Sequence, residues 1–533
     1  MRRGSIVVLG AVLWSVTSIA FGTADVKPLA EQTGSLASAI ENAIVGRRSL
    51  QSATIGVHVR DAASGDHLYG RGADAALIPA SNMKLLTTGA ALRVLGPDHV
   101  FETRIGWADD RIVIIGDGDP GLGDPALLEE SEPPVSVDEM LDALADAIVK
   151  APAARARASG VYIDDRVFDR EHVHASWPVD QLNRWYCAEV SGLNFHTNCL
   201  SFFFDADSDR GTREGGAPRV RLQPEVAGVG DWVSVRNKGE VVGKGRNTTW
   251  VARAAGARPA NEYTVFGNLR LDGSAMVDVA VHDPSLFFGR LLAERLAARQ
   301  IEIDRGSGVG AKVGRVEAAG GDAALTGFDP AVIVRTGMRD VLRRANTNSQ
   351  NLYTEALLKG VGHAVTQEPG SWQSGASVVR MLLSEDLGPS HATKTMIADG
   401  SGMSRENRVA PETMTAWLGS LLTRPALGAA LLESMPEPGS GTLRRRFKDA
   451  DLTNAVRAKT GSINGVRCLA GYVITPDGSE AVSFSVMVND IAHGSQIRDA
   501  LALHEDVVGA IDDWLTRVAV SNQEIDEPAA VGG

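Results

Sequence analysis

A serine and a lysine lie three residues apart at the start of an apolar, helix-forming run, in the stretch PASNMKLLTTGAAL at residues 79–92. Positions i and i+3 of a helix share one face, so the hydroxyl of Ser81 and the amine of Lys84 would point the same way. A serine hydroxyl is a poor nucleophile until a base takes its proton. The spacing therefore fits a nucleophile beside its base, and it also fits a helix N-cap followed by a surface lysine.

Two further polar stretches favour the catalytic interpretation. Ser-Gln-Asn at 349–351 stands at the entrance to an expected helix, and Lys-Thr-Gly at 459–461 lies inside an expected strand. Ser-x-x-Lys, Ser-Asp-Asn and Lys-Thr-Gly occur together, in that order, in class A β-lactamases and penicillin-binding proteins. Each residue alone has a structural explanation, as a cap, a turn residue or a solvated charge. Taken together, those explanations need three coincidences in the right order.

The first motif, at Ser81, and the second, at Ser349, are far apart in the sequence. A compact β-lactamase has no room for so long a segment between these two motifs. The chain resembles the low-molecular-mass class C penicillin-binding proteins, the D-alanyl-D-alanine carboxypeptidase/endopeptidase family. In that family a large domain is inserted between the first and second motifs, and a smaller one between the second and third. Gln350 stands where the motif has Asp, but this middle side chain should point away from the reacting atoms. The resemblance rests on the stretches LIPASNMKLLTTGAALRVLGPDHVFET, IIGDGDPGLGDP, SQNLYTEALLKGVG, ADGSGMSRENRV and AKTGSINGVRCLAGYV.

The resemblance implies an α+β fold with a β-lactamase/transpeptidase-like catalytic domain, which is an antiparallel sheet with helices on both faces. A large inserted domain and a smaller second insertion would interrupt it. The expected parts are a signal peptide at 1–24, the catalytic domain at 25–100 and 330–520 with a small insertion within about 385–445, the inserted domain at 101–329 and a disordered tail at 521–533.

Patterning at the two ends of the chain agrees with that single sheet. Leu36, Ile40 and Ile44 share one helical face, and the alternation in ATIGVHV followed by a turn signals a hairpin. Near the C-terminus, VRAKTGSI, VRCLAGYVI and AVSFSVMVND are strand-like, and the stretch from about residue 495 to 519 is an amphipathic helix. These elements could close one antiparallel sheet.

The activity that the resemblance implies is that of a serine D-alanyl-D-alanine carboxypeptidase, a D,D-endopeptidase, or both. It would cleave peptidoglycan stem peptides through an acyl-enzyme and would be acylated by β-lactam antibiotics such as penicillin, with no cofactor and no metal. Ser81 would be the nucleophile and Lys84 its base. Ser349 would relay a proton to the leaving amine, and Asn351 would hold the substrate amide and Lys84. The base must be neutral, and burial beside a second cation, Lys459, would lower its pKa.

The third motif would supply the substrate-binding side of the site. Lys459, with Thr460 and Ser462, would bind the terminal carboxylate of D-alanine. The backbone N–H groups of Ser81 and Ser462 would form the oxyanion hole. Gly461 would let the substrate backbone approach the strand closely.

Residues outside the motifs are given structural roles. Glu355 is interpreted as a helix-surface or structural carboxylate, and Ser401, among the turn glycines of ADGSGMSR, as structural. Cys187 and Cys199 are close enough in sequence to pair in an exported protein, and two buried thiols fit equally well.

Charge and the N-terminus indicate location and partners. A net charge of −13 argues against nucleic acid and against an anionic membrane surface. Arg2 and Arg3, an apolar run at about 6–21 and the small residues after it predict a signal peptide cut after Gly22 or Ala24. A retained N-terminal anchor is the alternative. No later stretch is apolar enough to span a membrane, so the expected location is periplasmic or cell-wall-associated.

Two rival functions remain open. One is a β-lactamase or esterase on the same fold, which would need an efficient route to deacylation by water. The other is a non-catalytic cell-wall-binding protein that keeps the fold. Turnover of a chromogenic cephalosporin separates the first rival, and covalent labelling by fluorescent penicillin separates the second.

Overall fold

The fold is known from a computed structural model, which describes residues 33–206, 213–254, 261–306, 310–317, 325–492 and 494–526. The expected signal peptide lies outside the described residues. The chain forms two compact units. Unit 1 contains His99–Val341 and Gln367–Ser371, and unit 2 contains the described residues before His99, Leu342–Thr366 and the chain from Trp372 onward. Within the described ranges, every helix is too short or too polar to cross a lipid bilayer.

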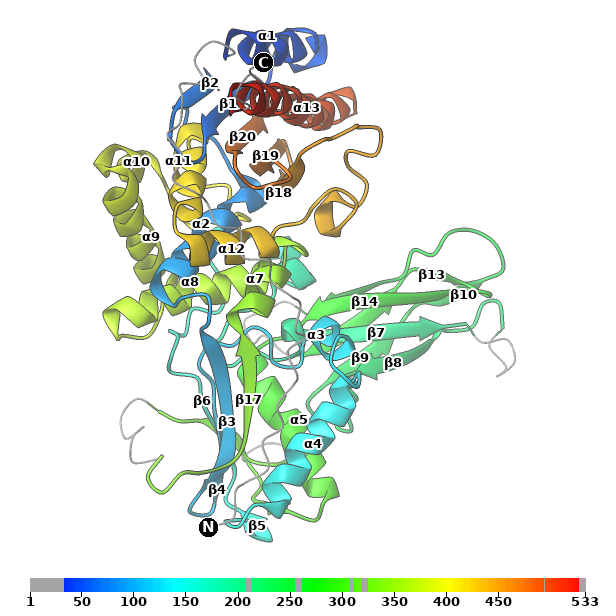
Figure 1. The fold of residues 1–533 in the computed structure, drawn as a ribbon. Helices are drawn as coiled ribbons and strands as arrows, with labels where there is room; N and C mark the ends of the chain where they lie inside the picture. The colour runs from blue at the N-terminus through cyan, green and yellow to red at the C-terminus, as the bar shows by residue number, and fades with distance from the viewer. Residues whose placement is uncertain are drawn as a thin grey trace, which may run out of the picture. The chain divides into compact units, whose positions relative to one another are not determined.

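Unit 2 is built on a five-stranded sheet that joins the two ends of the chain (Figure 1). The strand order is β18-β19-β20-β1-β2, and all neighbours are antiparallel. The hairpin predicted from the alternating pattern and the three C-terminal strands predicted from their strand-like sequences are therefore confirmed. The strand bounds are Thr54–Asp61 (β1), His67–Arg71 (β2), Ala455–Ile463 (β18), Val466–Ile474 (β19) and Ala481–Asn489 (β20).

Helices cover both faces of this sheet because successive side chains of a strand point to opposite sides. Val57 and Val59 of β1 are buried in one cluster with helices α1 (Thr33–Val45) and α13 (Ser495–Asp526). His58, between these two valines, faces the other side, where its Nδ1 lies 2.6 Å from Thr415 Oγ1 of α11 (Pro411–Leu422).

A second group of helices in unit 2 carries the polar motifs. Residues 83–92 of α2 are buried on every side, which explains why this run is apolar without a clear stripe. Helix α2 packs against α8, and α8 packs against α9. The helix bounds are Met83–Val94 (α2), Asn351–Thr366 (α8), Trp372–Leu387 (α9), Pro389–Lys394 (α10) and Pro425–Ser434 (α12).

Unit 1 has its own core between a mixed five-stranded sheet, two helices and smaller sheets (Figure 1). The five-stranded order is β16-β6-β4-β3-β17, and a three-stranded sheet has the order β14-β7-β8. The bounds are Val100–Ala108 (β3), Arg111–Ile115 (β4), Val161–Asp164 (β6), Cys199–Asp205 (β7), Arg219–Gln223 (β8), Ser274–Ala280 (β14), Val313–Arg315 (β16), Asp329–Gly337 (β17), Pro125–Glu129 (α3), Val137–Lys150 (α4) and Pro284–Ala298 (α5). The smaller sheets use Arg157–Ala158 (β5), Ser234–Asn237 (β9), Glu240–Val242 (β10), Trp250–Arg253 (β11), Glu262–Phe266 (β12), Asn268–Arg270 (β13) and Glu302–Ile303 (β15).

Three details differ from the sequence-based expectations or resolve them. Strand β17 pairs with β3 through Gly337, so residues 330–337 lie in a sheet of unit 1, although we assigned them to the catalytic domain. Helix α7 (Met338–Asn346) follows it. Helix α13 extends to Asp526, into the tail expected to be disordered at 521–533, because Gln and Glu continue a helix readily. Cys187 and Cys199 are both buried thiols and do not form a disulfide.

Candidate active site

Ser81 and Lys84 meet at the start of α2, as their spacing predicts. Ser81 lies in a 3₁₀ turn at Ala80–Asn82 that leads into the helix, and side chains three residues apart eclipse one another in such a turn. Lys84 is in the first turn of α2 and is completely buried. Its Nζ donates to Ser81 Oγ at 3.3 Å.

The Lys84 amine has two closer acceptors from other parts of unit 2. Its Nζ donates to Asn351 Oδ1 at 2.7 Å and to the backbone carbonyl of Ser401 at 2.8 Å. Asn351 is the first residue of α8, and Ser349 just before it has a left-handed φ of 59°. That turn brings Asn351 to Lys84 and Ser349 to Lys459 of the third motif.

The third motif contacts the second directly. Lys459 is fully buried in β18, and its Nζ donates to Ser349 Oγ at 2.8 Å and to the Thr460 carbonyl at 3.0 Å. The structure therefore brings together the five residues that the sequence analysis selected as catalytic: Ser81, Lys84, Ser349, Asn351 and Lys459.

Strand β18 is at the edge of its sheet and can accept a further strand. The Ala458 N–H donates to the Pro436 carbonyl, which lies outside the sheet, at 3.1 Å. Because N–H groups of a strand alternate in direction, those of Thr460 and Ser462 point to the same outer edge as that of Ala458. This direction is the one that an oxyanion hole at Ser462 requires. Ser462 itself is exposed.

Burial sets the protonation of the two lysines. Burial lowers the pKa of Lys84 to about 8, while the charges of Glu355 and Asp399 oppose that shift. Burial also lowers the pKa of Lys459 well below its ordinary value, and repulsion from Lys84 adds to this. The sequence analysis expected Lys459 to lower the pKa of Lys84, but burial causes that shift, and the repulsion between the two lysines lowers the pKa of Lys459 instead. A neutral Lys84 is accessible near neutral pH, which a general base requires.

Gly461 has a packing reason to be glycine. A Cβ at this position would lie 2.6 Å from the carbonyl oxygen of Pro79 and 3.1 Å from Asn82 Oδ1. This close approach is that of the segment that carries Ser81, and the approach of a substrate backbone to Gly461 stays a prediction. Gly461 lets the first and third motifs lie against each other.

Sequence reasoning missed two contributors to the site. It treated Ser401 as structural, yet the Ser401 carbonyl is an acceptor for Lys84. It also allowed Glu355 a place on the helix surface, yet Glu355 is fully buried, and burial, followed by the nearby Asp399, raises its pKa to about 7. Every residue has a backbone carbonyl, so the identity of residue 401 could not predict this contact. The glycines on either side of Ser401 indicated only a tight loop.

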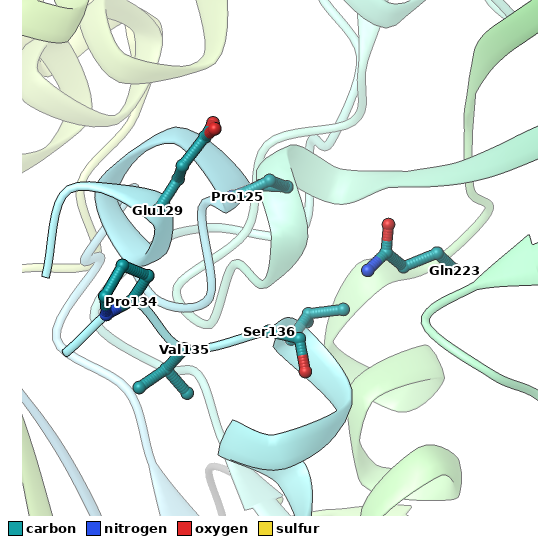
Figure 2. A pocket seen from close by; sticks show the side chains of 7 residues that line it. Pro125, Glu129, Pro134, Val135, Ser136 and Gln223 are labelled. Carbon is teal, nitrogen blue, oxygen red and sulfur yellow. The ribbon is translucent and has the colours of Figure 1, made fainter.

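A separate pocket of about 250 Å³ lies in unit 1 (Figure 2). Ser136 is one of its lining residues, but its Oγ accepts a hydrogen bond from the Glu139 N–H and caps α4. Its Oγ also donates to Glu139 Oε2 at 2.8 Å, so this serine and the carboxylate beside it form the capping box of the helix. The pocket is lined by Pro125, Glu129, Pro134, Val135, Ser136, Val137 and Gln223.

Comparison with known proteins gives concordant matches over most of the chain. The profile of the D-Ala-D-Ala carboxypeptidase 3 (S13) family matches residues 36–508. A D-alanyl-D-alanine carboxypeptidase of an Actinomadura species is 30% identical over 484 residues, which cover 87% of this chain and 83% of that protein. Penicillin-sensitive carboxypeptidase A of Dictyostelium discoideum is 23% identical over 471 residues, covering 84% and 83%.

Solved structures share the fold. Penicillin-binding protein 4 of Haemophilus influenzae superposes with a TM-score of 0.67 at 20% identity, over 88% of this chain and 99% of that one. The same protein in complex with a β-lactam superposes with a TM-score of 0.62, over 87% and 99%. This likeness confirms the predicted α+β, β-lactamase/transpeptidase-like fold.

Proposed function

The chain belongs to the D-Ala-D-Ala carboxypeptidase 3 (S13) family, and we propose that Ser81 and Lys84 carry out its reaction. It is a serine-type D-alanyl-D-alanine carboxypeptidase, the activity that its three motifs predict. The resemblance to the low-molecular-mass class C penicillin-binding proteins is confirmed by the same matches.

In the proposed acylation step, Ser81 Oγ attacks the carbonyl carbon of the penultimate D-alanine while neutral Lys84 takes the hydroxyl proton. The N–H groups of Ser81 and Ser462 stabilise the resulting oxyanion. Ser349 relays to the leaving amine the proton that Lys84 took from Ser81, the C–N bond breaks, and the terminal D-alanine departs. The 2.7 Å bond between Asn351 and Lys84 supports the role of Asn351 in holding the base.

Lys459 and its strand are proposed to bind the substrate. An extended peptide along the outer edge of β18 would continue the sheet, with its terminal carboxylate on Lys459, Thr460 and Ser462. The position of Lys459 beside Ser349 Oγ supports this, because the carboxylate and the leaving amine belong to the same D-alanine.

Hydrolysis of the acyl-enzyme completes the reaction, and we infer that it is slow for a penicillin adduct. A β-lactamase would need a carboxylate able to activate water, as in class A enzymes. Glu355 is a buried carboxylate near Lys84, but both of its oxygens accept hydrogen bonds from the backbone or from an indole. This arrangement favours the carboxypeptidase over the β-lactamase alternative.

We propose peptidoglycan stem peptides as the natural substrate and an extracytoplasmic location for the enzyme. The substrate follows from D-alanyl-D-alanine specificity, and the location follows from the signal-like N-terminus. N-terminal sequencing of exported protein should begin near residue 23 or 25, and recovery of only an intact Met1 form in the cytoplasm would contradict export. Residues 101–329 are proposed to form an inserted domain that shapes access or wall binding and supplies no catalytic group.

The observation that carries this proposal is the completely buried Lys84 amine, which lies within hydrogen-bonding distance of Ser81 Oγ and Asn351 Oδ1. Its test is release of D-alanine from a peptide that ends in D-alanyl-D-alanine. The native protein should release one D-alanine per peptide, and Ser81→Ala should release none. Equal release by the two proteins contradicts the assignment of Ser81.

A further inference from the structure

Glu355 binds the loop at residues 400–402, whose Ser401 carbonyl accepts a hydrogen bond from Lys84. Its Oε1 accepts from the Ser401 N–H at 2.8 Å, and its Oε2 accepts from the Gly400 N–H at 2.9 Å and from Trp372 Nε1 at 2.8 Å. All three donors require an acceptor, and an ionised carboxylate is the side chain that offers only acceptors. The carboxylate is completely buried.

The loop held by Glu355 has little freedom to move. A Cβ on Gly400 would lie 2.5 Å from the Thr354 carbonyl oxygen, and one on Gly402 would lie 1.8 Å from the carbonyl oxygen of Ala80, next to the nucleophile. Thr87 of α2 donates from Oγ1 to the Gly400 carbonyl at 2.8 Å. The Ser401 carbonyl is therefore held in place from both α8 and α2.

The Ser401 carbonyl determines which way the Lys84 lone pair points. A neutral amine has two N–H groups and one lone pair. Asn351 Oδ1 at 2.7 Å and the Ser401 carbonyl at 2.8 Å take the two N–H groups. The remaining direction leads to Ser81 Oγ at 3.3 Å. In the ammonium form Nζ donates along this direction, and in the neutral form the hydrogen bond reverses, so that the lone pair faces the hydroxyl proton.

We propose that Glu355 is a positioning residue for acylation: by holding the Ser401 carbonyl, it aims the lone pair of Lys84 at Ser81 Oγ. The proposal rests on the proposed roles of Ser81 and Lys84. It adds a residue that touches neither the substrate nor the reacting atoms. It also explains why a full carboxylate is buried beside α2, where an apolar side chain would pack at lower cost.

The charge of Glu355 also acts on Lys84. The charged groups that face this part of the site are Asp399 on the loop, Lys459 on β18 and Lys359 one turn further along α8, whose Nζ lies 3.8 Å from the Trp372 ring centroid. Glu355 and Asp399 raise the pKa of Lys84. Removing one negative charge therefore lowers that pKa, and the base becomes neutral at a lower pH.

The decisive test is Glu355→Gln, with acylation by benzylpenicillin followed over time at several pH values. An amide presents N–H donors to the backbone and indole N–H groups, so the loop must shift. We expect the limiting acylation rate to fall at least about tenfold, as for a disturbed general base. The non-covalent affinity for benzylpenicillin should stay the same. The acid limb of the plot of acylation rate against pH should move to lower pH.

Asp512→Asn is the matched control for loss of a buried carboxylate. Asp512 is buried in α13 and accepts from the N–H groups of Thr453 and Asn454 at 3.0 and 2.8 Å, so it holds a loop in the same way but elsewhere in unit 2. This variant should keep the native acylation rate and pH profile. A folded Glu355→Gln protein that keeps the native limiting acylation rate overturns the proposal. If the native protein is not acylated at all, the proposed function fails instead.

Thr87→Val keeps the proposal testable if Glu355→Gln does not fold. Valine has nearly the same shape but cannot donate to the Gly400 carbonyl, so one of the two supports of the loop is lost. We expect slower acylation at unchanged non-covalent affinity. Thr415→Val is the control, because Thr415 is an equally buried helical threonine whose hydroxyl faces His58. A Thr87→Val protein that acylates at the native rate overturns the proposal.

Discussion

Lys459 Nζ lies 2.8 Å from Ser349 Oγ, which joins the second and third motifs through a direct hydrogen bond between residues 110 positions apart. The lysine comes from the edge strand of a sheet, and the serine comes from the turn that begins a helix. In the proposed mechanism, Lys459 binds the substrate carboxylate and Ser349 passes a proton to the leaving amine. The contact explains why the two motifs must occur together.

The carboxylate-binding role of Lys459 predicts a selective loss. Lys459→Ala should reduce turnover of a peptide with a free C-terminal carboxylate by more than tenfold, because a buried charge pair contributes roughly 2–5 kcal/mol. A C-terminally amidated peptide should be poor with the native enzyme and lose little more with the variant. Lys394→Ala, at an exposed ion pair with Glu412, is the control. Equal treatment of acid and amide by both enzymes contradicts the role.

The buried position of Lys84 predicts how the acylation rate depends on pH. Its pKa is lowered to about 8, so the fraction of neutral base, and with it the acylation rate, should rise as pH increases through that value. Lys84→Ala should lose about 10²–10⁴-fold in acylation rate and should lose this dependence on pH. Stopped-flow acylation by a β-lactam measures both. A native rate that stays constant with pH across this range is incompatible with a lysine base.

The contact between the first and third motifs predicts the effect of a single methyl group. Gly461→Ala would place a Cβ 2.6 Å from the Pro79 carbonyl, so it should destabilise unit 2 by about 1–3 kcal/mol and slow acylation. Gly360→Ala is the control within α8, where an added Cβ meets no atom within 4 Å. It should be neutral or stabilising by about 0.5–1 kcal/mol. Denaturant unfolding and acylation rates check both. Native behaviour of Gly461→Ala would refute the packing argument.

The two ends of the region between β3 and β17 are adjacent, which makes excision practicable. The Met338 N–H donates to the His99 carbonyl at 2.8 Å, so a short linker can replace residues 100–337. A folded deletion variant should still be acylated at Ser81, although residues 367–371, which belong to unit 1, lose their partners. Near-UV circular dichroism establishes folding, and Ser81→Ala in the same background is the control. A folded variant that cannot be acylated would show that the excised region supplies a catalytic group.

Most of the unit 2 sheet could be predicted because the run that forms β1 alternates, the three C-terminal runs are strand-like, and α1 and α13 each have one apolar face. Leu36, Ile40 and Ile44 are all buried, as their helical spacing requires. The three motifs were sufficient to select the five residues that meet, because each motif belongs to a local element that its own sequence specifies. Their distances could not be predicted, since these depend on pairing between the two ends of the chain.

Glu355 could not be assigned from sequence because its spacing from Lys359 is typical of an exposed ion pair on a helix. Both side chains are in fact completely buried, since α8 packs on α2 and α9. The role of Ser401 depends on its backbone carbonyl, which any residue would provide. The glycines beside it, Gly400 and Gly402, are the part of this arrangement that sequence can show.

The most direct test of the account is the intact mass of the protein after incubation with benzylpenicillin, followed by peptide mapping. The β-lactam C–N bond should open to give a single ester on Ser81, with the ring nitrogen protonated and the adduct lost only slowly. Ser81→Ala should show no adduct, whereas Lys84→Ala should form one far more slowly than the native enzyme. An adduct on Ser401 or any other residue, or rapid multiple turnover of penicillin, would contradict the mechanism and favour a β-lactamase or esterase.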